Sequence, residues 1–341
     1  MPVRTVSMRP ETSSIEITGD YPVSPSRLWN AYADPSQLER FWGPPTYPAT
    51  VVRNDMAVGG HTHYYMTGPE GDTSHGYWSF TEVHAPHSFV VTDGFADASG
   101  NPNTDAPEMT MSFRFDATEE GATVTMVTSF ASSEDMDKLV GMGMAEGLEA
   151  AMGQLDGVLA DPDSAAPGTG TQLTVISDTV VRITRVLAGD VRHAWRAHHD
   201  ADVLRRWQLG PDGWSMPVCE VSSTVGESYR FGWQQDATPD ATPDASATAE
   251  PAPAFGFTGE VLEAEEPYRA VTTEMMTDGE GTPVPDGPVT RNELSLAPVA
   301  EGTLLTLLIT YPGVAARDMI LGTGMVDGME TSYARLDQLE V

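Results

Sequence analysis

Three histidines form the cluster whose residue types and spacing are most typical of a chemical site. His61 and His63 stand two residues apart in a stretch that alternates like a β-strand, so their imidazoles project from one face. His75 lies on the next such stretch, from which it would supply a third nitrogen. This set predicts a zinc site or an acid–base pair. The second half of the chain repeats none of the three, so we predict exposed or cavity-rim histidines, no metal and no cofactor.

The run His198-His199-Asp200 has the composition of a catalytic dyad. Adjacent residues on a helix point about 100° apart, and Asp200 stands where a helix N-cap is expected, so we interpret the run as structural. The motifs of serine hydrolases, P-loop enzymes, dinucleotide-binding enzymes and zinc proteases are absent from the sequence. The sequence therefore favours a protein that is not an enzyme. It leaves open a cyclase or hydrolase that uses a His or Tyr inside a cavity as its acid.

The seven Trp and 17 Met residues are more informative than the charged groups. Methionine adapts to irregular surfaces, and an interior lined by Met and aromatic side chains suits a planar or lipid-like ligand. Ordinary core packing explains the same residues equally well. Both interpretations stay open at the level of the sequence.

The chain is strongly acidic, with 50 Asp and Glu against 18 Lys and Arg and a net charge of −32. Such a surface repels phosphate groups, so neither nucleic acid nor an anionic membrane is expected as a partner. No apolar run approaches the roughly 18–20 residues of a membrane span, and no apolar segment of a secretory signal opens the chain. We therefore expect a cytoplasmic protein. Cys219 is the single cysteine, which excludes an internal disulfide and a thiolate cluster.

The chain is a tandem duplication. The stretch Leu139–Glu149 (LVGMGMAEGLE) recurs as Ile320–Glu330 (ILGTGMVDGME). Both stretches belong to patterns with apolar residues at three- and four-residue steps, which predicts an amphipathic helix that closes each copy. Residues 236–254 form a low-complexity Ala/Pro/Asp insert that has no counterpart in the first copy and lacks the residues to bury a core. Two domains, each with its own core, follow from this repeat.

Each copy has the same order of predicted elements. A strand opens it at Ser14–Thr18 or Val180–Arg185, and a capped helix start follows at Ser24 or Asp190. A series of alternating strands leads to the closing helix, which predicts an α+β fold with helices on one face of a curved antiparallel sheet. We predict a disordered lead at 1–12, domains at 13–160 and 173–341, a linker at 161–172, and a disordered insert at 236–254.

Several motifs together resemble a known family. They are Ser-Pro-x-x-Leu-Trp-x-Ala-Tyr-x-Asp-Pro, Phe-Trp-Gly-Pro, Gly-Gly before an aromatic strand, and Gly-Met-x-x-Gly-Leu-Glu in the closing helix. The pattern is similar to the START-like (SRPBCC) superfamily, in the branch named for the activator of heat shock protein 90 ATPase. The resemblance covers about residues 14–160 and 175–341. It implies two tandem helix-grip (START/Bet v-like) domains, in which the sheet wraps a long C-terminal helix and leaves an apolar cavity.

The resemblance also implies which residues face each interior. Aligning Gly60 with Gly226 places the aromatic strands of the two copies in register. The implied cavity residues of the first copy are Trp42, His63, Tyr65, Met111, Phe113, Met144 and Leu148. Those of the second copy are Trp207, Tyr229, Phe231, Leu294, Met325 and Met329.

The function that the resemblance implies is binding of a small hydrophobic or aromatic molecule, with the cavity of the first copy favoured over that of the second. The alternative is a protein-interaction module like the co-chaperone for which the branch is named. Against that role, the sequence shows no sign of the additional N-terminal domain that the co-chaperone carries. We expect a bacterial-type protein that is a monomer or a homodimer.

Overall fold

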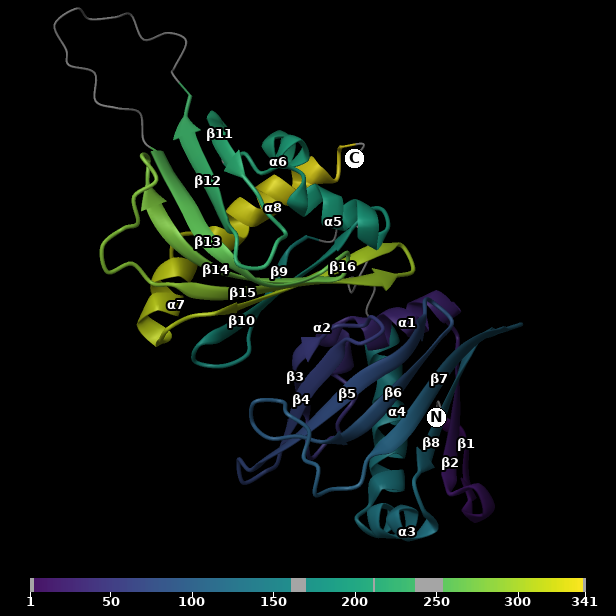
Figure 1. The fold of residues 1–341 in the computed structure, drawn as a ribbon. Helices are drawn as coiled ribbons and strands as arrows, with labels where there is room; N and C mark the ends of the chain where they lie inside the picture. The colour runs from purple at the N-terminus through teal and green to yellow at the C-terminus, as the bar shows by residue number, and fades with distance from the viewer. Residues whose placement is uncertain (1–2, 161–169, 211, 237–253, 340–341) are drawn as a thin grey trace, which may run out of the picture. The chain divides into compact units, whose positions relative to one another are not determined.

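The computed structural model describes residues 3–160, 170–210, 212–236 and 254–339, which form two compact domains (Figure 1). Each domain contains an eight-stranded antiparallel sheet. The strand order is β1-β2-β8-β7-β6-β5-β4-β3 in the first sheet and β9-β10-β16-β15-β14-β13-β12-β11 in the second. The two sheets therefore share one topology, and the predicted α+β fold with tandem domains is confirmed.

The first domain begins with two strands and two short helices, continues with six strands, and ends with two helices. Its strands are β1 Val3–Arg9, β2 Ser14–Tyr21, β3 Ala49–Asn54, β4 His61–Thr67, β5 Thr73–His84, β6 Ser88–Phe95, β7 Met109–Thr118 and β8 Gly121–Phe130. Its helices are α1 Pro25–Ala33, α2 Pro35–Leu38, α3 Ser133–Gly141 and α4 Met144–Leu159, with a 3-10 turn at Pro10–Thr12.

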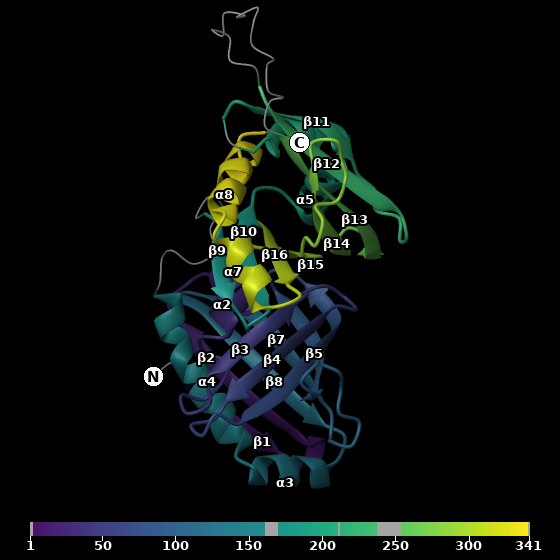
Figure 2. The same ribbon diagram turned by 90° about the vertical axis from the view of Figure 1, so that its left-hand side faces the viewer.

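The second domain repeats this order. Its strands are β9 Gln172–Val175, β10 Val180–Leu187, β11 Trp214–Glu220, β12 Ser228–Gln235, β13 Ala254–Glu265, β14 Arg269–Asp278, β15 Thr290–Val299 and β16 Gly302–Thr310. Its helices are α5 Val191–His199, α6 Ala201–Trp207, α7 Val314–Leu321 and α8 Met325–Leu336. Figure 2 shows α8 lying across one face of the sheet, as α4 does in the first domain.

Local side chains start the helices where the sequence predicts. The Ser24 hydroxyl accepts a hydrogen bond from the Arg27 amide at the start of α1, and Asp190 accepts one from the His193 amide at the start of α5. These caps satisfy amides that lack a partner within the first helical turn. The closing helix of each domain is divided in two, because a left-handed glycine, Gly143 or Gly324, precedes α4 and α8.

The disordered lead expected at residues 1–12 is not what the structure shows. Strand β1 occupies Val3–Arg9 and pairs antiparallel with β2, with Met8 opposite Ile15. Backbone pairing with a neighbour holds this edge strand, and Met8 is 48% exposed, so no buried apolar alternation marks it in the sequence. The predicted linker and insert lie almost entirely outside the described residues.

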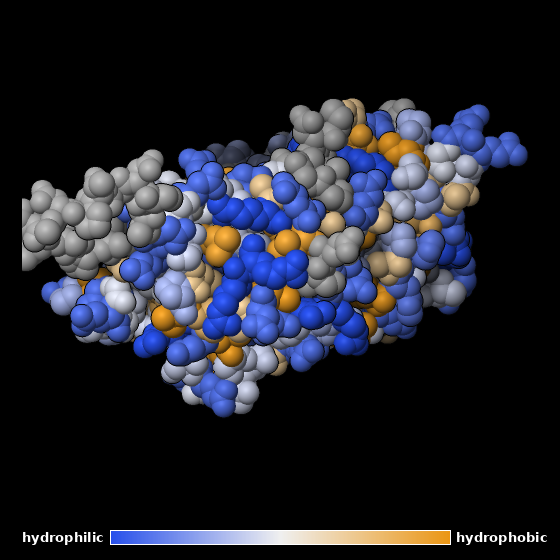
Figure 3. All heavy atoms as spheres, turned by 90° about the horizontal axis from the view of Figure 1, so that it is seen from above, coloured by the Kyte–Doolittle hydropathy of each residue, from blue (hydrophilic) through white to orange (hydrophobic). Residues whose placement is uncertain are grey.

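The molecular surface is largely hydrophilic (Figure 3). Hydrophilic residues cover most of the face seen in Figure 3, with single apolar residues between them. In the parts of the chain that the structure describes, no helix is long and apolar enough to cross a membrane.

Candidate functional site

Aromatic side chains fill the interior of the first domain. Phe89 of β6 and Phe113 of β7 stack with their ring centroids 4.3 Å apart, and Trp78 of β5 lies 5.8 Å from Phe113. Tyr32 of α1 packs on Phe113 at 5.3 Å. All four side chains are at most 1% exposed. This side of the sheet, which carries Trp78, Phe89 and Phe113 and faces the helices, is called the inner face of the first domain.

Most of the predicted cavity residues of the first domain belong to this packed interior. Met111 and Phe113 are each 1% exposed and Trp42 is 4% exposed. The Trp42 ring meets Trp78 edge to face at 4.7 Å. Leu148 of α4 is 9% exposed, and Met144, at the start of that helix, is partly exposed.

The structure aligns the aromatic strands of the two domains one residue away from the expected register. Gly59 and Gly226 both adopt left-handed φ angles, of 84° and 85°. Their amides donate to the carbonyls of Phe80 and Val261, at equivalent places on β5 and β13. The counterpart of Gly226 is therefore Gly59, and not Gly60.

This shift places His63 and Tyr65 outside the interior in which we expected them. His63 pairs with Tyr77 and Tyr65 with His75, whereas Thr62 pairs with Trp78 on the inner face. Successive residues of a strand point to opposite faces, so an error of one residue moves every side chain to the other side of the sheet.

The clustered histidines His61, His63 and His75 therefore lie on the outer face of the first sheet. His63 Nε2 is 3.2 Å from His75 Nδ1, and the two rings stack. Burial, reinforced by the neighbouring His75, lowers the pKa of His63 to about 4, so its imidazole is neutral near pH 7. Within the described residues, no group of three His, Cys, Asp or Glu side chains is arranged to hold a metal ion.

The run His198-His199-Asp200 has the structural role that we predicted. His198 Nδ1 donates to the Ala194 carbonyl at 2.8 Å, which leaves Nε2 to accept from the Tyr333 hydroxyl at 3.3 Å. The His199 ring stacks on Trp195 at 3.8 Å. Asp200 accepts bonds from two amides at the start of α6.

The second domain places its aromatic residues on different strands. The cross-strand pair Phe89–Phe113 of the first domain corresponds to Ala270–Leu294 in the second. Gly259 stands at the position of Trp78, where a Cβ atom would lie 2.9 Å from the Tyr229 ring. The aromatic side chains lie instead on β12 and β13, near one edge of the sheet: Tyr229, Phe231, Trp233, Phe255 and Phe257.

Side chains on the corresponding inner face of the second domain remain partly exposed. The side chains of Leu294 and Leu307 are both partly exposed, whereas those of their counterparts Phe113 and Met126 are each 1% exposed. The partly exposed apolar side chains that pack around the two core clusters of this face include Phe231, Phe257, Leu294, Leu307, Met325 and Met329. Four of the six predicted cavity residues of this domain are among them.

The helices above this face bury little of their own surface at one end. Helix α7 has no buried residue, and the buried residues of α8 are confined to its C-terminal half: Ser332, Tyr333 and Leu336. In contrast, α4 of the first domain buries residues from Ala145 to Val158. The predicted residue Trp207 lies under the buried half of α8, where it stacks on Tyr333 at 5.1 Å.

A polar cluster sits on the same inner face. The Glu274 carboxylate of β14 accepts a hydrogen bond from Asn292 of β15. The Tyr229 hydroxyl lies 3.4 Å from Glu274 Oε2 and 2.9 Å from the Thr273 carbonyl. The Asn292 Oδ1 atom and the hydroxyl of Tyr311, a residue that is 2% exposed, are buried without a partner among the described residues. Buried polar atoms normally have a partner, so these two atoms indicate a missing one.

Burial shifts the ionisation of this cluster. It raises the pKa of the Glu274 carboxyl above its ordinary value, while the hydrogen bonds from Asn292 and Tyr229 act in the opposite direction. Burial and the nearby Glu274 raise the pKa of Tyr311 to about 12. The cluster therefore holds a carboxyl group that is easier to protonate than a carboxyl in water.

The first domain has a carboxyl at the same position but in apolar surroundings. Asp93 pairs with Met109 as Glu274 pairs with Thr290. Asp93 accepts bonds from Trp78 Nε1 at 2.9 Å and from the Tyr64 hydroxyl at 3.4 Å. Three residues near Asp93 are apolar, whereas the corresponding residues near Glu274 are polar. The strand pairings match Met109 and Met111 with Thr290 and Asn292. Phe130 matches Tyr311, because their amides donate to the carbonyls of Ser13 and Thr179 at equivalent places.

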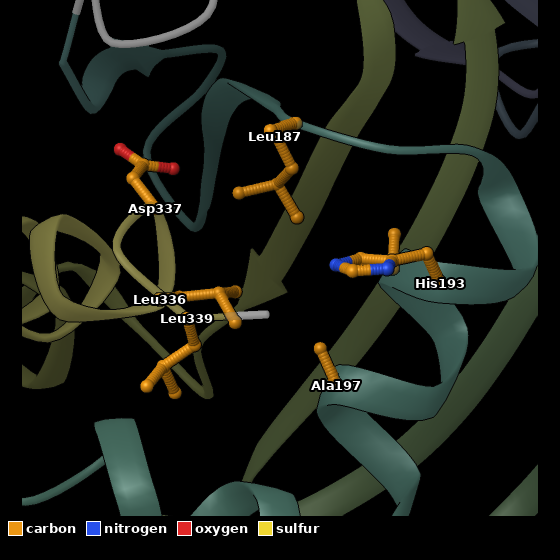
Figure 4. A pocket seen from close by; sticks show the side chains of 8 residues that line it. Leu187, His193, Ala197, Leu336, Asp337 and Leu339 are labelled. Atoms are coloured by element: carbon orange, nitrogen blue, oxygen red, sulfur yellow. The ribbon is translucent and has the colours of Figure 1, made fainter. Parts of the chain in front are cut away.

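A small pocket lies away from this cluster, between the start of α5 and the end of α8 (Figure 4). Its volume is about 20 Å³. That volume holds a water molecule, whereas organic ligands need roughly 300 Å³ or more. Residues that line it include Leu187, His193 and Leu336. We therefore assign it no ligand.

Comparisons with known proteins decide the family. Residues 22–160 and 190–340 both match the family model described as Activator of Hsp90 ATPase homolog 1-like protein. The chain belongs to this family. The two matched segments correspond to the two domains. The comparison with curated proteins found no match.

Solved structures of single-domain length resemble parts of this chain. A protein from Mycobacterium smegmatis is 43% identical, with 47% of this chain and 98% of that chain covered and a TM-score of 0.44. A protein from Arthrobacter aurescens is 38% identical, with 48% and 95% covered and a TM-score of 0.44. A protein from Rhodobacter sphaeroides is 27% identical, with 49% and 95% covered and a TM-score of 0.41.

Arg185 of β10 anchors α8 to the sheet in the second domain of this family member. Its side chain is 2% exposed and forms ion pairs with Glu330 and Asp337 of the helix region. The guanidinium also lies over the Tyr333 ring, 5.5 Å from its centroid. These contacts hold α8 from Glu330 to its C-terminal end, while the preceding residues of α8 and the whole of α7 bury little surface.

Replacing Arg185 with Met should destabilise the second domain by about 2 to 3 kcal/mol, because it removes a buried cation from two carboxylates and an aromatic ring. Urea unfolding and hydrogen exchange of α8 measure the effect. Arg196→Met is the control, since Arg196 forms an exposed pair with Asp200 that should contribute about 0.5 kcal/mol or less. Equal losses in the two variants would contradict the anchoring role.

Sequence analysis missed Glu274, Asn292 and Tyr311 in this family member. No motif contains them, and the sequence marks them only as residues within or next to the alternating strands of the second copy. The available signal was the difference between the copies, in which Asn292 and Tyr311 replace Met111 and Phe130. A correct pairing of all the strands is needed to see that these changes surround one carboxyl.

Proposed function

We propose that the protein binds a small hydrophobic or aromatic molecule between the sheet and α8 of its second domain. One observation carries the proposal: Leu294 and Leu307 remain partly exposed where Phe113 and Met126 of the first domain are each 1% exposed. Hydrated apolar surface costs roughly 25 cal/mol per Å², and a ligand that covers it recovers this free energy. The weakly buried α7 and N-terminal half of α8 supply the side from which a ligand enters.

The first domain is the less suitable binder, although the sequence favoured it. The stacked pair Phe89–Phe113 occupies the centre of its inner face, and the corresponding pair in the second domain is the smaller Ala270–Leu294. The rings of Tyr32 and Trp78 also pack against Phe113. A ligand would have to displace well-packed aromatic side chains in the first domain, which costs more free energy than displacing water from a partly exposed apolar face.

Titration of the full chain with Nile red, a neutral fluorescent probe of apolar sites, tests the proposal. We expect saturable binding at one site. Leu294→Phe restores the side chain of the first domain, so it should weaken binding by about tenfold or more. Leu262→Phe is the matched control, because Leu262 is 37% exposed on the same sheet and lies outside the proposed site.

Two results would overturn the proposal. The first is an absence of saturable Nile red binding to the native chain. The second is equal binding by Leu294→Phe and Leu262→Phe. Native mass spectrometry of the protein purified from its own host then identifies the natural ligand, as an adduct that disappears on denaturation.

A further inference from the structure

We propose that the second domain selects an apolar ligand with a primary amine at its polar end, and that Glu274, Asn292 and Tyr311 hold the ammonium group. This inference rests on the binding function proposed above and names the chemical class of the ligand. It is carried by the polar cluster of the inner face, whose oxygen atoms face an otherwise apolar interior.

The carboxyl of Glu274 lacks a cationic partner among the described residues. Its neighbours are the amide of Asn292 and the hydroxyl of Tyr229, both uncharged donors. Glu274 is partly exposed in the free protein, so a ligand that covers it also removes water from its carboxylate, and a bound ammonium supplies the counter-charge that this desolvation requires. A ligand carboxylate at this position would place two anions together.

The protein's own cations near this face are engaged elsewhere. Arg317 of α7, whose charge reaches Tyr311, pairs with Asp318 and donates to the Ser177 carbonyl. Arg185 pairs with two carboxylates of the α8 region. Neither side chain is therefore available as the counter-charge of Glu274.

The number of oxygen acceptors matches an ammonium group. Asn292 Oδ1 accepts only, and the Tyr311 hydroxyl both accepts and donates, yet neither atom has a partner within the described chain. Together with the carboxylate of Glu274, they provide three acceptors, and a primary ammonium carries three N–H donors. An alcohol offers one donor, so it satisfies this cluster less completely.

The first domain shows what the same position looks like without such a site. Asp93 receives its hydrogen bonds from Trp78 and Tyr64, which belong to the packed core. The residues around it are apolar at the three positions that are polar in the second domain. The polar acceptors are therefore found in the second domain, whose interior is partly exposed, and not at the same positions of the first domain, whose interior is filled.

Competition against bound Nile red tests the inference with three ligands that share one alkyl chain: 1-octylamine, 1-octanol and octanoate. The titrations use the full chain at pH 7 in about 0.3 M salt, which screens adsorption of the amine to the acidic surface. We expect octylamine to displace the probe about tenfold more tightly than octanol, and octanoate to be the weakest.

Substitution of the carboxyl gives the decisive comparison. Glu274→Gln keeps the shape and removes the charge, so the preference for octylamine over octanol, measured within this variant, should fall from about tenfold to about one. Asp93→Asn, the matched change in the first domain, should leave the amine preference intact. An amine preference that persists in Glu274→Gln overturns the inference, as does octanol or octanoate binding as tightly as octylamine to the native chain.

The two proposals fail in different ways. If Nile red binds and none of the three ligands displaces it, the inference about the amine fails and the binding function stands. If Nile red does not bind at all, the binding function itself fails. Urea unfolding of Glu274→Gln, read from hydrogen exchange of β14 peptides, shows whether the variant is folded, and saturable Nile red binding by it shows that the apolar site is present.

Discussion

With Asn in place of Asp93, the first domain should lose a pH dependence of stability that amounts to about 4 kcal/mol in the native chain. The Asp93 side chain is 6% exposed. Burial raises its pKa from 3.8 to about 7, although the hydrogen bonds from Trp78 and Tyr64 favour the charged form. The folded state therefore prefers the neutral carboxyl. This stabilisation is complete below the ordinary pKa and is lost as the pH rises through the folded pKa.

The measurable quantity is the difference in unfolding free energy between the Asp93→Asn protein and the native chain. It should shift in favour of the variant by about 4 kcal/mol between about pH 4 and pH 8. Urea unfolding followed by hydrogen exchange of peptides from β6 and β7 reports on the first domain alone. Asp116→Asn, at an exposed position paired with Arg114, should show no such shift. A difference that stays constant over this pH range would mean that Asp93 titrates like an exposed carboxyl.

The conservation of an acidic group at this position in both domains has a physical consequence. Asp93 and Glu274 each lie on the inner face of a sheet, where each accepts hydrogen bonds from uncharged donors. Each therefore lowers the stability of its own domain near neutral pH, unless a proton or a ligand cation compensates its charge. In the second domain, a bound ammonium would provide that compensation, so ligand binding and stability are expected to be linked.

The elements that sequence analysis predicted correctly depend on local interactions. The Ser24 and Asp190 side chains cap α1 and α5 through bonds to amides three residues away. The repeated closing motif predicts α4 and α8, because the spacing of its apolar residues matches one face of a helix. These features need no knowledge of distant contacts, so a single sequence is sufficient to find them.

The site depends on information that is not local. A period of two tells which residues of β4 share a face, but it does not tell which face is inside. That choice depends on pairing with β5, where Thr62 meets Trp78 and His63 meets Tyr77. The aligned Gly-Gly motif suggested Gly60 as the counterpart of Gly226, whereas the left-handed conformation marks Gly59. One residue of error was enough to exchange inner and outer side chains.

Replacing Phe89 with Ala should destabilise the first domain by about 3 to 5 kcal/mol, because it leaves a cavity in a filled interior. Phe89 is 0% exposed. Its ring stacks on Phe113 at 4.3 Å and meets Trp29 edge to face at 5.8 Å. Urea unfolding, read from hydrogen exchange of β7 peptides, measures the loss.

The same variant tests why only one of the two domains is proposed to bind. Phe89→Ala introduces the residue that the second domain has at Ala270, so a second equivalent of Nile red should bind to the chain. Val90→Ala, on the opposite face of β6, is the control and should leave the stoichiometry at one. If Phe89→Ala lowers the unfolding free energy of the first domain by less than about 1 kcal/mol, the aromatic stack does not hold this interior together. If stability falls and a second equivalent binds, the volume of one cross-strand pair decides whether a domain of this topology is filled by its own side chains or by a ligand.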